Sequence, residues 1–389
     1  MKRKNKISTI AFTIVFILLT AVTGIVSFVK LVKFYVNDEV DYNEWTADLG
    51  NKFETDIATS FFEKFEFVNL NGAMRNLLEQ KEMNGVIKLN NGYLMTAVGY
   101  VDDETLQYYA NKVALFDSYL INRGTKLVYA LTPYISCKYD PQLPTGIEDY
   151  GNDNADRLMS MLETAGIDII DFREAMHEDG INQYDMMYKT DHHWNTEAGF
   201  YAYGILEDYI INETGCNVDE RISNINNYTI TKYEEWHLGA NGQRTGRYYA
   251  GIDDFDLIIP NFETSIQRED GTVGNMQDIA INMEPLEKKE YTSRYTYDLV
   301  LGASLGHFVN LNSENDIKVL IITDSFGKAV CPYLMMGFSE IYYIRDWDVS
   351  EITPDFIESY DPDVVILLYY LPNAMWDNLY NFQNFIDEE

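Results

Sequence analysis

Residues 317–334 read IKVLIITDSFGKAVCPYL and combine a buried strand, a polar turn and the first turns of a helix. Val319 to Ile322 are all apolar and mostly β-branched, which is typical of a strand buried on both faces. Ser325 follows at the mouth of the next helix, where unpaired N–H groups and partial positive charge stabilise an anion that forms nearby. Ser325 is therefore a candidate nucleophile, although Asp324 and Ser325 are also preferred helix-capping residues.

Apolar runs and helix-periodic stretches alternate on both sides of this segment. Strands are predicted at 125–133, 167–172, 340–346 and 363–370, helices at 103–124, 154–166 and 328–338, and a hairpin over 85–98 that turns at Asn90-Asn91-Gly92. Strands that alternate with helices indicate an α/β fold with a mostly parallel sheet flanked by helices. The stretch from 212 to 298 contains irregular strands and many turns, and we interpret it as a β-rich insertion in a catalytic domain spanning residues 85–389.

The first 33 residues differ in composition from the rest. Four basic residues within positions 2–6 precede residues 7–29, which carry no charge and are long enough as a helix to cross a bilayer core of about 30 Å. The positive-inside rule places the N-terminus in the cytoplasm. We predict a single-pass anchor in the cell membrane at residues 1–33, a stalk and entry helix at 34–84 and an extracytoplasmic body. A cleaved signal peptide is the alternative, but no clear cleavage pattern follows the apolar run.

The charge of the body limits its partners. The chain has 62 acidic and 29 basic residues, and six of the basic residues lie within the first 33 positions, so the body carries 62 acids against 23 bases. Such a surface repels nucleic acid, and we predict no nucleic-acid binding. Neutral glycans or cations suit it, although solubility alone also explains the charge. The three cysteines, Cys137, Cys216 and Cys331, form neither a zinc pattern nor a disulfide framework.

Residues 188–199 read YKTDHHWNTEAG and supply the groups that a serine nucleophile needs. A serine hydroxyl requires a histidine to remove its proton and a carboxylate to orient that histidine. Asp191 and His193 can face the same side of a locally extended chain. A metal site at Asp191, His192 and His193 is the alternative, but the other histidines show no matching ligand spacing. We predict neither a metal nor a cofactor; a metal hydrolase would instead be sensitive to chelators.

The string YKTDHHWNTEAG resembles the signature of the bacterial DHHW protein family, which is related to the SGNH-hydrolase-like domains of alginate and other cell-surface polysaccharide O-acetyltransferases. The likeness extends over residues 85–380 and includes KVLIITDSFGKAVCPYL and YDLVLGASLGHFVNLN. It implies an SGNH-hydrolase-like fold and a catalytic triad of Asp191, His193 and Ser325. The sequence departs from the family pattern at Thr323 and Gly327, and neither change removes a catalytic atom.

The resemblance also implies an oxyanion hole made by the nucleophile's own N–H group, a glycine N–H and an asparagine side chain. Besides Ser325, the candidate donors are Asn310, Arg345 and Asn373. Arg345 has the alternative of a structural ion pair with a nearby acid. Trp194 and His192 flank His193 and are candidate substrate-binding residues, although a tryptophan is more often part of the core.

The activity that the resemblance implies is acetyl transfer through an acyl-enzyme to a cell-surface polysaccharide. It further implies that a multi-spanning membrane acyltransferase supplies the acetyl group, because acetyl-CoA is absent outside the cell. Two alternatives stay open at this point. One is an SGNH-type carbohydrate esterase, in which water replaces the sugar as acceptor, and the other is a non-catalytic glycan-binding or assembly protein.

Overall fold

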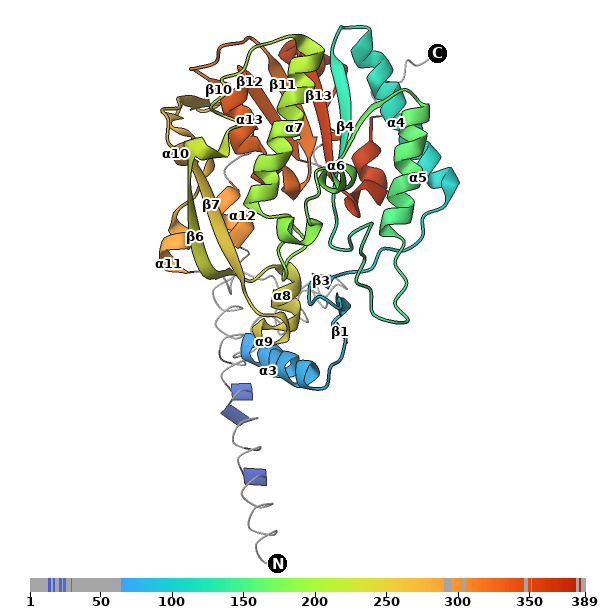
Figure 1. The fold of residues 1–389 in the computed structure, drawn as a ribbon, viewed down its shortest axis with the longest axis vertical. Coiled ribbons are helices and arrows are strands. Elements are labelled where there is room, and N and C mark those ends of the chain that lie inside the picture. The colour runs from blue at the N-terminus through green and yellow to red at the C-terminus, as the bar shows by residue number, and fades with distance from the viewer. Residues whose placement is uncertain are drawn as a thin grey trace, which may run out of the picture.

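The computed structural model describes residues 13, 14, 17, 21, 22, 24, 25, 29, 64–289, 296–302, 306–345, 349–350, 352–382 and 385 (Figure 1). The predicted membrane segment at residues 7–29 and most of the predicted stalk lie largely outside these residues. Within the described residues, every helix is too short or too polar to cross a membrane.

A mixed eight-stranded sheet forms the centre of the molecule, so the predicted α/β class is confirmed. Five neighbouring strands are parallel: β5 (Asp168–Asp171), β4 (Lys126–Thr132), β13 (Val364–Tyr370), β11 (Lys318–Thr323) and β12 (Glu340–Arg345). Three antiparallel strands continue the sheet beyond β12: β10 (Gly306–Asn310), β8 (Ile266–Arg268) and β9 (Val273–Gly274).

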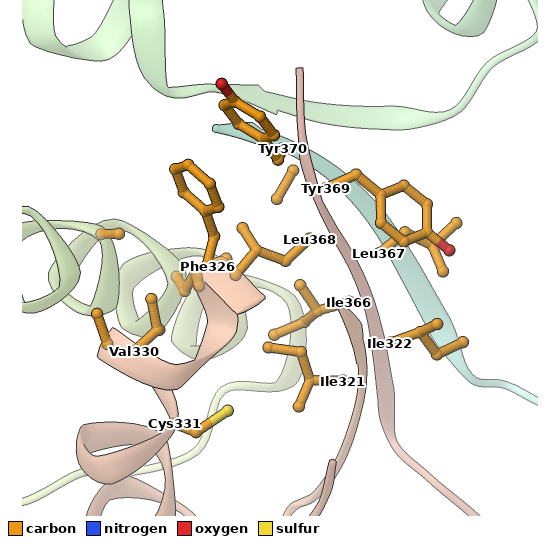
Figure 2. Packing of buried hydrophobic residues seen from close by; sticks show 14 of the residues in the cluster. Ile321, Ile322, Phe326, Val330, Cys331, Ile366, Leu367, Leu368, Tyr369 and Tyr370 are labelled. Carbon is orange, nitrogen blue, oxygen red and sulfur yellow. The ribbon is translucent and has the colours of Figure 1, made fainter. Parts of the chain in front are cut away.

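The central strands are apolar because both faces of the sheet are covered. Every residue of β13 is buried, and so is every residue of β11 after Lys318. Side chains of these two strands alternate between the faces, as Figure 2 shows for Ile321, Ile366 and Leu368 on the side of Phe326, Val330 and Cys331, and for Ile322, Leu367 and Tyr369 on the other. Helices cover the sheet: α4 (Asp103–Ile121), α5 (Gly151–Thr164), α6 (Phe172–Glu178), α7 (Thr196–Thr214), α13 (Cys331–Gly337) and α14 (Pro354–Tyr360).

The segment after β11 differs from the single helix that the sequence predicts over 328–338. Residues Ser325–Ala329 form a 3₁₀ helix, η3, and α13 begins only at Cys331. Pro332 lies in the first turn of α13, where its missing N–H group costs nothing, so the chain restarts its helix there. Asp324, not Ser325, caps η3, since its side chain accepts a hydrogen bond from Phe326 N. The Ser325 hydroxyl is therefore not used for capping.

The segment predicted as an insertion divides into two parts. Strands β6 (Tyr228–His237) and β7 (Asp253–Pro260) form a separate antiparallel pair, and α8 (Ala240–Thr245) and α9 (Arg247–Ala250) connect them. Strands β8 and β9, by contrast, extend the main sheet. Strands of two or three residues carry no readable periodicity, which is why the sequence does not reveal this extension. Short helices follow: α10 (Met276–Ala280), α11 (Glu284–Lys288) and α12 (Thr296–Leu301).

A small N-terminal subassembly packs below α8 and α9 (Figure 1). It consists of α3 (Lys64–Leu77) and the strands β1 (Glu82–Met83), β2 (Val86–Lys88) and β3 (Leu94–Met95). The predicted hairpin is confirmed, because β2 and β3 pair antiparallel and Gly92 adopts a φ of 92° in the turn. Further 3₁₀ helices are η1 (Gln183–Met186), η2 (Ile225–Asn227), η5 (Asn373–Met375) and η6 (Asp377–Tyr380).

Candidate active site

Ser325, His193 and Asp191 meet at the carboxyl end of β11. His193 Nε2 lies 2.6 Å from Ser325 Oγ, and His193 Nδ1 lies 3.2 Å from Asp191 Oδ2. Ser325 follows β11 after one residue, Asp324, whereas Asp191 and His193 come from the loop between η1 and α7. The two predicted motifs are thus in direct contact although 132 positions separate the serine from the histidine.

Backbone pairing holds the loop that carries Asp191 and His193. Met187 and Trp194 form an antiparallel bridge, and Tyr188 N donates to His193 O at 3.2 Å. Asn195 then caps α7 by accepting a hydrogen bond from Ala198 N. The loop is therefore closed at its base and leads straight into a long helix, which restricts where the histidine can lie.

Trp194 is a structural residue here, so its predicted role in substrate binding is wrong. Its side chain is fully buried, and its Nε1 donates to Phe326 O at 3.0 Å. The hydrogen bond connects the loop of His193 to η3, the element that begins with Ser325. A side chain without exposed surface cannot contact a substrate, but it can fix the distance between the two loops.

The protonation of the three groups suits proton transfer. Burial alone would raise the pKa of Asp191, but His193, His192 and their hydrogen bonds hold it well below its usual value. Asp191 is therefore an ionised acceptor, so His193 Nδ1 donates to it and His193 Nε2 accepts from the Ser325 hydroxyl. Burial and the neighbouring His192 lower the pKa of His193 to about 4. A neutral imidazole in contact with a serine hydroxyl can act as a general base.

His192 lies at the surface of the site. Its side chain is 35% exposed, and its Nδ1 contacts Asp191 Oδ1 at 2.9 Å. Burial opposes its positive charge, but the attraction of Asp191 outweighs that effect and raises the pKa of His192. Its ring lies 3.9 Å from the ring of His193 and 5.6 Å from that of Tyr370. Its exposure keeps His192 a candidate for contact with substrate.

Aromatic side chains enclose the ring of His193. Tyr297, from α12, stacks on it with a centroid distance of 4.2 Å and an interplanar angle of 18°. The Tyr297 hydroxyl also donates to Ser325 O at 3.1 Å, and Phe326 lies 5.2 Å from the imidazole. Tyr297 begins the stretch YDLVLGASLGHFVNLN, which carries part of the family resemblance, but the sequence does not show that its ring stacks on His193.

Asn310 is not an oxyanion donor, and its prediction is wrong. Strand β10 runs antiparallel to β12, with Val309 opposite Glu340 at the first residue of β12. Asn310 therefore lies at the end of the sheet where the parallel strands begin, opposite to Ser325. There its Nδ2 donates to Met336 O at 2.6 Å. The prediction failed because the direction of a strand cannot be read from its sequence.

The other two predicted donors lie near the nucleophile. Asn373 Nδ2 donates to Asp324 Oδ2 at 3.1 Å, beside Ser325. Arg345 ends β12 directly opposite Thr323, the last residue of β11. Both remain candidates for the second oxyanion donor. Asp324 itself is buried and also accepts a hydrogen bond from Tyr370 N at 2.6 Å, so it fastens the end of β11 to the end of β13.

In the part of the chain that the structure describes, two groups of side chains have the geometry of a metal site. Asp191, His192 and His193 form one, and Asp156, Asp171 and Glu174 form the other. In the first group both histidines donate to the carboxylate. In the second group all three carboxylates pair with Arg173 or Lys138. Protein partners therefore already use the potential ligand atoms of both groups. At the first group this favours a hydrogen-bonded relay, by which we mean the chain of contacts from Asp191 through His193 to Ser325, over a metal centre.

Comparison with known proteins supports the resemblance found in the sequence. Residues 91–216 match a family model for the SGNH hydrolase-like domain of the acetyltransferase AlgX. No curated protein matches the chain. Among solved structures, Bacillus cereus PatB1 is similar with a TM-score of 0.60 and 19% identity, covering 76% of this chain and 99% of PatB1. A form of PatB1 with a sulfonyl adduct is also known.

Two further structures are similar. A DHHW family protein from Eubacterium siraeum has a TM-score of 0.56 and 19% identity, covering 78% of this chain and 96% of its own. The O-acetyltransferase domain of Pseudomonas putida AlgJ has a TM-score of 0.50 and 11% identity, covering 76% and 93%. At these identities the likeness concerns the fold. The predicted resemblance to the SGNH-hydrolase-like and DHHW proteins is confirmed.

Proposed function

We propose that the protein is an extracytoplasmic O-acetyltransferase that modifies a cell-surface polysaccharide through an acetyl-enzyme on Ser325. The observation that carries the proposal is the continuous contact from Asp191 through His193 to Ser325 Oγ. The resemblance to AlgX and to the AlgJ domain, which are named as acetyltransferases, favours acetyl transfer over simple hydrolysis.

The proposed reaction has two halves with the same base. His193 Nε2 takes the proton of Ser325 as Oγ attacks the acetyl carbonyl, and Asp191 stabilises the imidazolium. The tetrahedral intermediate collapses, and the leaving oxygen of the donor takes the proton from His193. A sugar hydroxyl then gives its proton to His193 and attacks the acetyl ester. Ser325 Oγ leaves and recovers the proton, which restores the starting state.

The developing oxyanion needs donors that the enzyme holds in place. We assign one to the backbone N–H of Ser325 and the second to Asn373 or Arg345, which lie at the ends of the neighbouring strands. Loss of such a donor lowers kcat by about 10²- to 10³-fold. Asn373→Ala and Arg345→Ala should therefore differ strongly in kcat, and the variant with the larger loss identifies the second donor.

The supply of acetyl depends on the membrane. The basic N-terminus and the uncharged residues 7–29 support a single-pass anchor with the catalytic domain outside the cytoplasm. Acetyl-CoA is not present there, so we propose a multi-spanning membrane acyltransferase as the source of acetyl groups. The acceptor is a polysaccharide at the same surface, in agreement with an acidic body that repels nucleic acids and anionic surfaces.

The test treats full-length protein with phenylmethylsulfonyl fluoride and locates the adduct by mass spectrometry. We expect an adduct on Ser325, and no adduct in Ser325→Ala or His193→Ala. Ser359→Ala, which changes an exposed serine of α14, should react like the wild type. Incubation with an acetyl ester and a glycan then separates the activities: acetylated glycan supports the transferase, and free acetate alone indicates an esterase. An active Ser325→Ala protein would reject the proposal.

A further inference from the structure

The carboxylate of Asp191 is held from a second side by the segment that links β6 to α8. His237 is the last residue of β6 and is fully buried. Its Nε2 lies 2.9 Å from Asp191 Oδ2. Because an ionised carboxylate can only accept hydrogen bonds, His237 Nε2 carries the proton and donates. A second histidine thus contacts the acid of the proposed triad from a different element.

The rest of this segment follows the chain around Asp191 closely. Ala240 N donates to Asp191 Oδ1 at 3.3 Å, and Gly239 N donates to Thr190 Oγ1 at 3.0 Å. A Cβ atom at Gly239 would lie 2.2 Å from the Cβ of Asp191, a distance that no side chain can occupy. Residues 237–240 therefore form a clamp on Asp191, and we refer to them as the Asp191 clamp.

His237 and His193 share one oxygen of the carboxylate. Asp191 Oδ2 accepts from His193 Nδ1 at 3.2 Å and from His237 Nε2 at 2.9 Å. The donor on the clamp fixes the rotation of the carboxylate, so that Oδ2 stays directed at His193. It also takes part of the negative charge that otherwise acts on His192 and His193. Both effects reach Ser325 only through His193.

We infer that His237 is a positioning residue of the relay, so that Ser325, His193, Asp191 and His237 act as one hydrogen-bonded chain. The inference rests on the proposed function, because positioning matters only if His193 acts as the base. It also gives the β6–β7 pair a role, since this pair delivers the clamp to the site.

The contacts of His237 indicate which substitution should preserve its role. Within the described residues its Nδ1 has no hydrogen-bond partner, and the nearby Tyr188 ring only packs against it at 4.4 Å. Among the described residues, the only hydrogen bond of the His237 side chain is therefore the one to Asp191, and Asp253 on β7 acts on the ring through its charge alone. Glutamine places an amide N–H at a similar reach, whereas asparagine is shorter and leucine has no donor.

Variants of the full-length protein test this inference. The readouts are the rate at which phenylmethylsulfonyl fluoride modifies Ser325 and the kcat and KM for 4-nitrophenyl acetate hydrolysis, both over a pH series. For His237→Leu we expect a loss of about tenfold or more in both rates, the equivalent of one hydrogen bond to a charged group, with KM unchanged. The acid limb of the profile should move to higher pH, because a more basic Asp191 favours protonated His193.

Matched variants separate positioning from packing. His237→Gln should keep most of the rate and the wild-type pH profile, and His237→Asn should behave like His237→Leu. Phe255→Leu removes buried volume beside His237 without touching Asp191, so it should lower stability and leave the profile in place. If His237→Leu does not fold, the comparison of His237→Gln with His237→Asn still separates positioning from packing, because the two side chains have the same polar group and differ only in reach.

The pH readout is interpreted against all ionisable groups around the relay. Those groups are Asp191 and His192 on the loop, His237 on β6, Asp253 on β7, Tyr297 and Asp298 on α12, Asp324 and Lys328 around η3, and Tyr370 at the end of β13. Apart from His237 itself, each of these groups is retained in every His237 variant, so a shift of the limb reports the lost donor.

The two possible failures are distinguishable. A His237→Leu protein with the wild-type rate and pH profile overturns the inference and leaves the proposed function intact. Equal loss in the glutamine and asparagine variants also overturns it, since that pattern indicates packing. A wild-type protein whose Ser325 fails to react with the reagent overturns the proposed function itself, whatever the variants do.

Discussion

At the scale of single residues, the chemistry of the site depends on the hydrogen-bond donors that surround the carboxylate of Asp191. Its two oxygens accept from His192, His193 and His237 and from the backbone at Ala240. The spacing in the string DHHW was enough to predict the contact with His193. It was not enough for His237, because that residue lies 46 positions away and is brought in by a strand whose register the sequence does not reveal.

The pH dependence of the reaction follows from the pKa of His193. Burial lowers this pKa to about 4, from an ordinary value of 6.5, so the neutral base persists well into acidic solution. As the pH is lowered, we expect kcat/KM for a neutral acetyl ester to be unchanged at pH 6.5 and to fall to half its plateau value near pH 4, where half of His193 is protonated. A profile of kcat/KM against pH, which reports the free enzyme, measures it. Half-loss close to 6.5 would contradict the assignment.

His192 contributes to that depression. Its pKa is raised by Asp191, so its positive charge opposes protonation of His193 next to it. His192→Gln removes the charge, and we expect the acid limb of kcat/KM to move to higher pH. His177→Gln makes the same change on the exposed face of α6 and should leave the limb in place. An unchanged limb in His192→Gln would show that burial alone lowers the pKa of His193.

At the scale of elements, η3 and α7 hold the two halves of the relay together. A Cβ atom at Gly199, in the first turn of α7, would lie 2.4 Å from Ala329 O in η3, so the two elements are in backbone contact. The sequence did not reveal this contact between α7 and η3. It also predicted a continuous helix at 328–338, because periodicity cannot show that Pro332 starts a new one.

The cap of α7 should be measurable as stability. Asn195 Oδ1 accepts from Ala198 N at 2.9 Å, and its Nδ2 donates to Asp185 O at 2.8 Å. We expect Asn195→Ala to lower the free energy of unfolding by about 1 kcal/mol, the usual cost of losing an N-cap. Denaturant titration followed by circular dichroism measures the change. Asn195→Ser keeps a capping oxygen and should lose less; equal losses would mean that the contact with Asp185 dominates.

At the scale of the whole molecule, the sequence predicted the central strands well and the sheet edge poorly. The strands β4, β11, β12 and β13 are recognisable because burial on both faces requires continuous apolar runs. The order and direction of β10, β8 and β9 depend on contacts between distant segments, which leave no local pattern. The same limit explains why Asn310 was placed at the wrong end of the sheet and why the Asp191 clamp was not foreseen.

The proposed anchor gives a prediction for the entire chain. Full-length protein should stay in the membrane pellet after alkaline carbonate extraction, because residues 7–29 form an uncharged segment of spanning length. A variant in which a cleavable export signal replaces residues 1–33 should appear in the soluble fraction. Protease added to intact cells should digest the body, as the positive-inside rule requires. Full-length protein that washes off in carbonate would refute the anchor.

The position of β13 affects how the protein matures. This strand, from the last tenth of the chain, pairs with β4 on one side and β11 on the other, so it closes the middle of the sheet. If the proposed anchor keeps the N-terminus in the cytoplasm and the body crosses the membrane in chain order, β4 emerges long before the strand that completes its pairing. On that route the central sheet stays incomplete until β13 has emerged, so folding of the sheet depends on pairing between segments far apart in the chain.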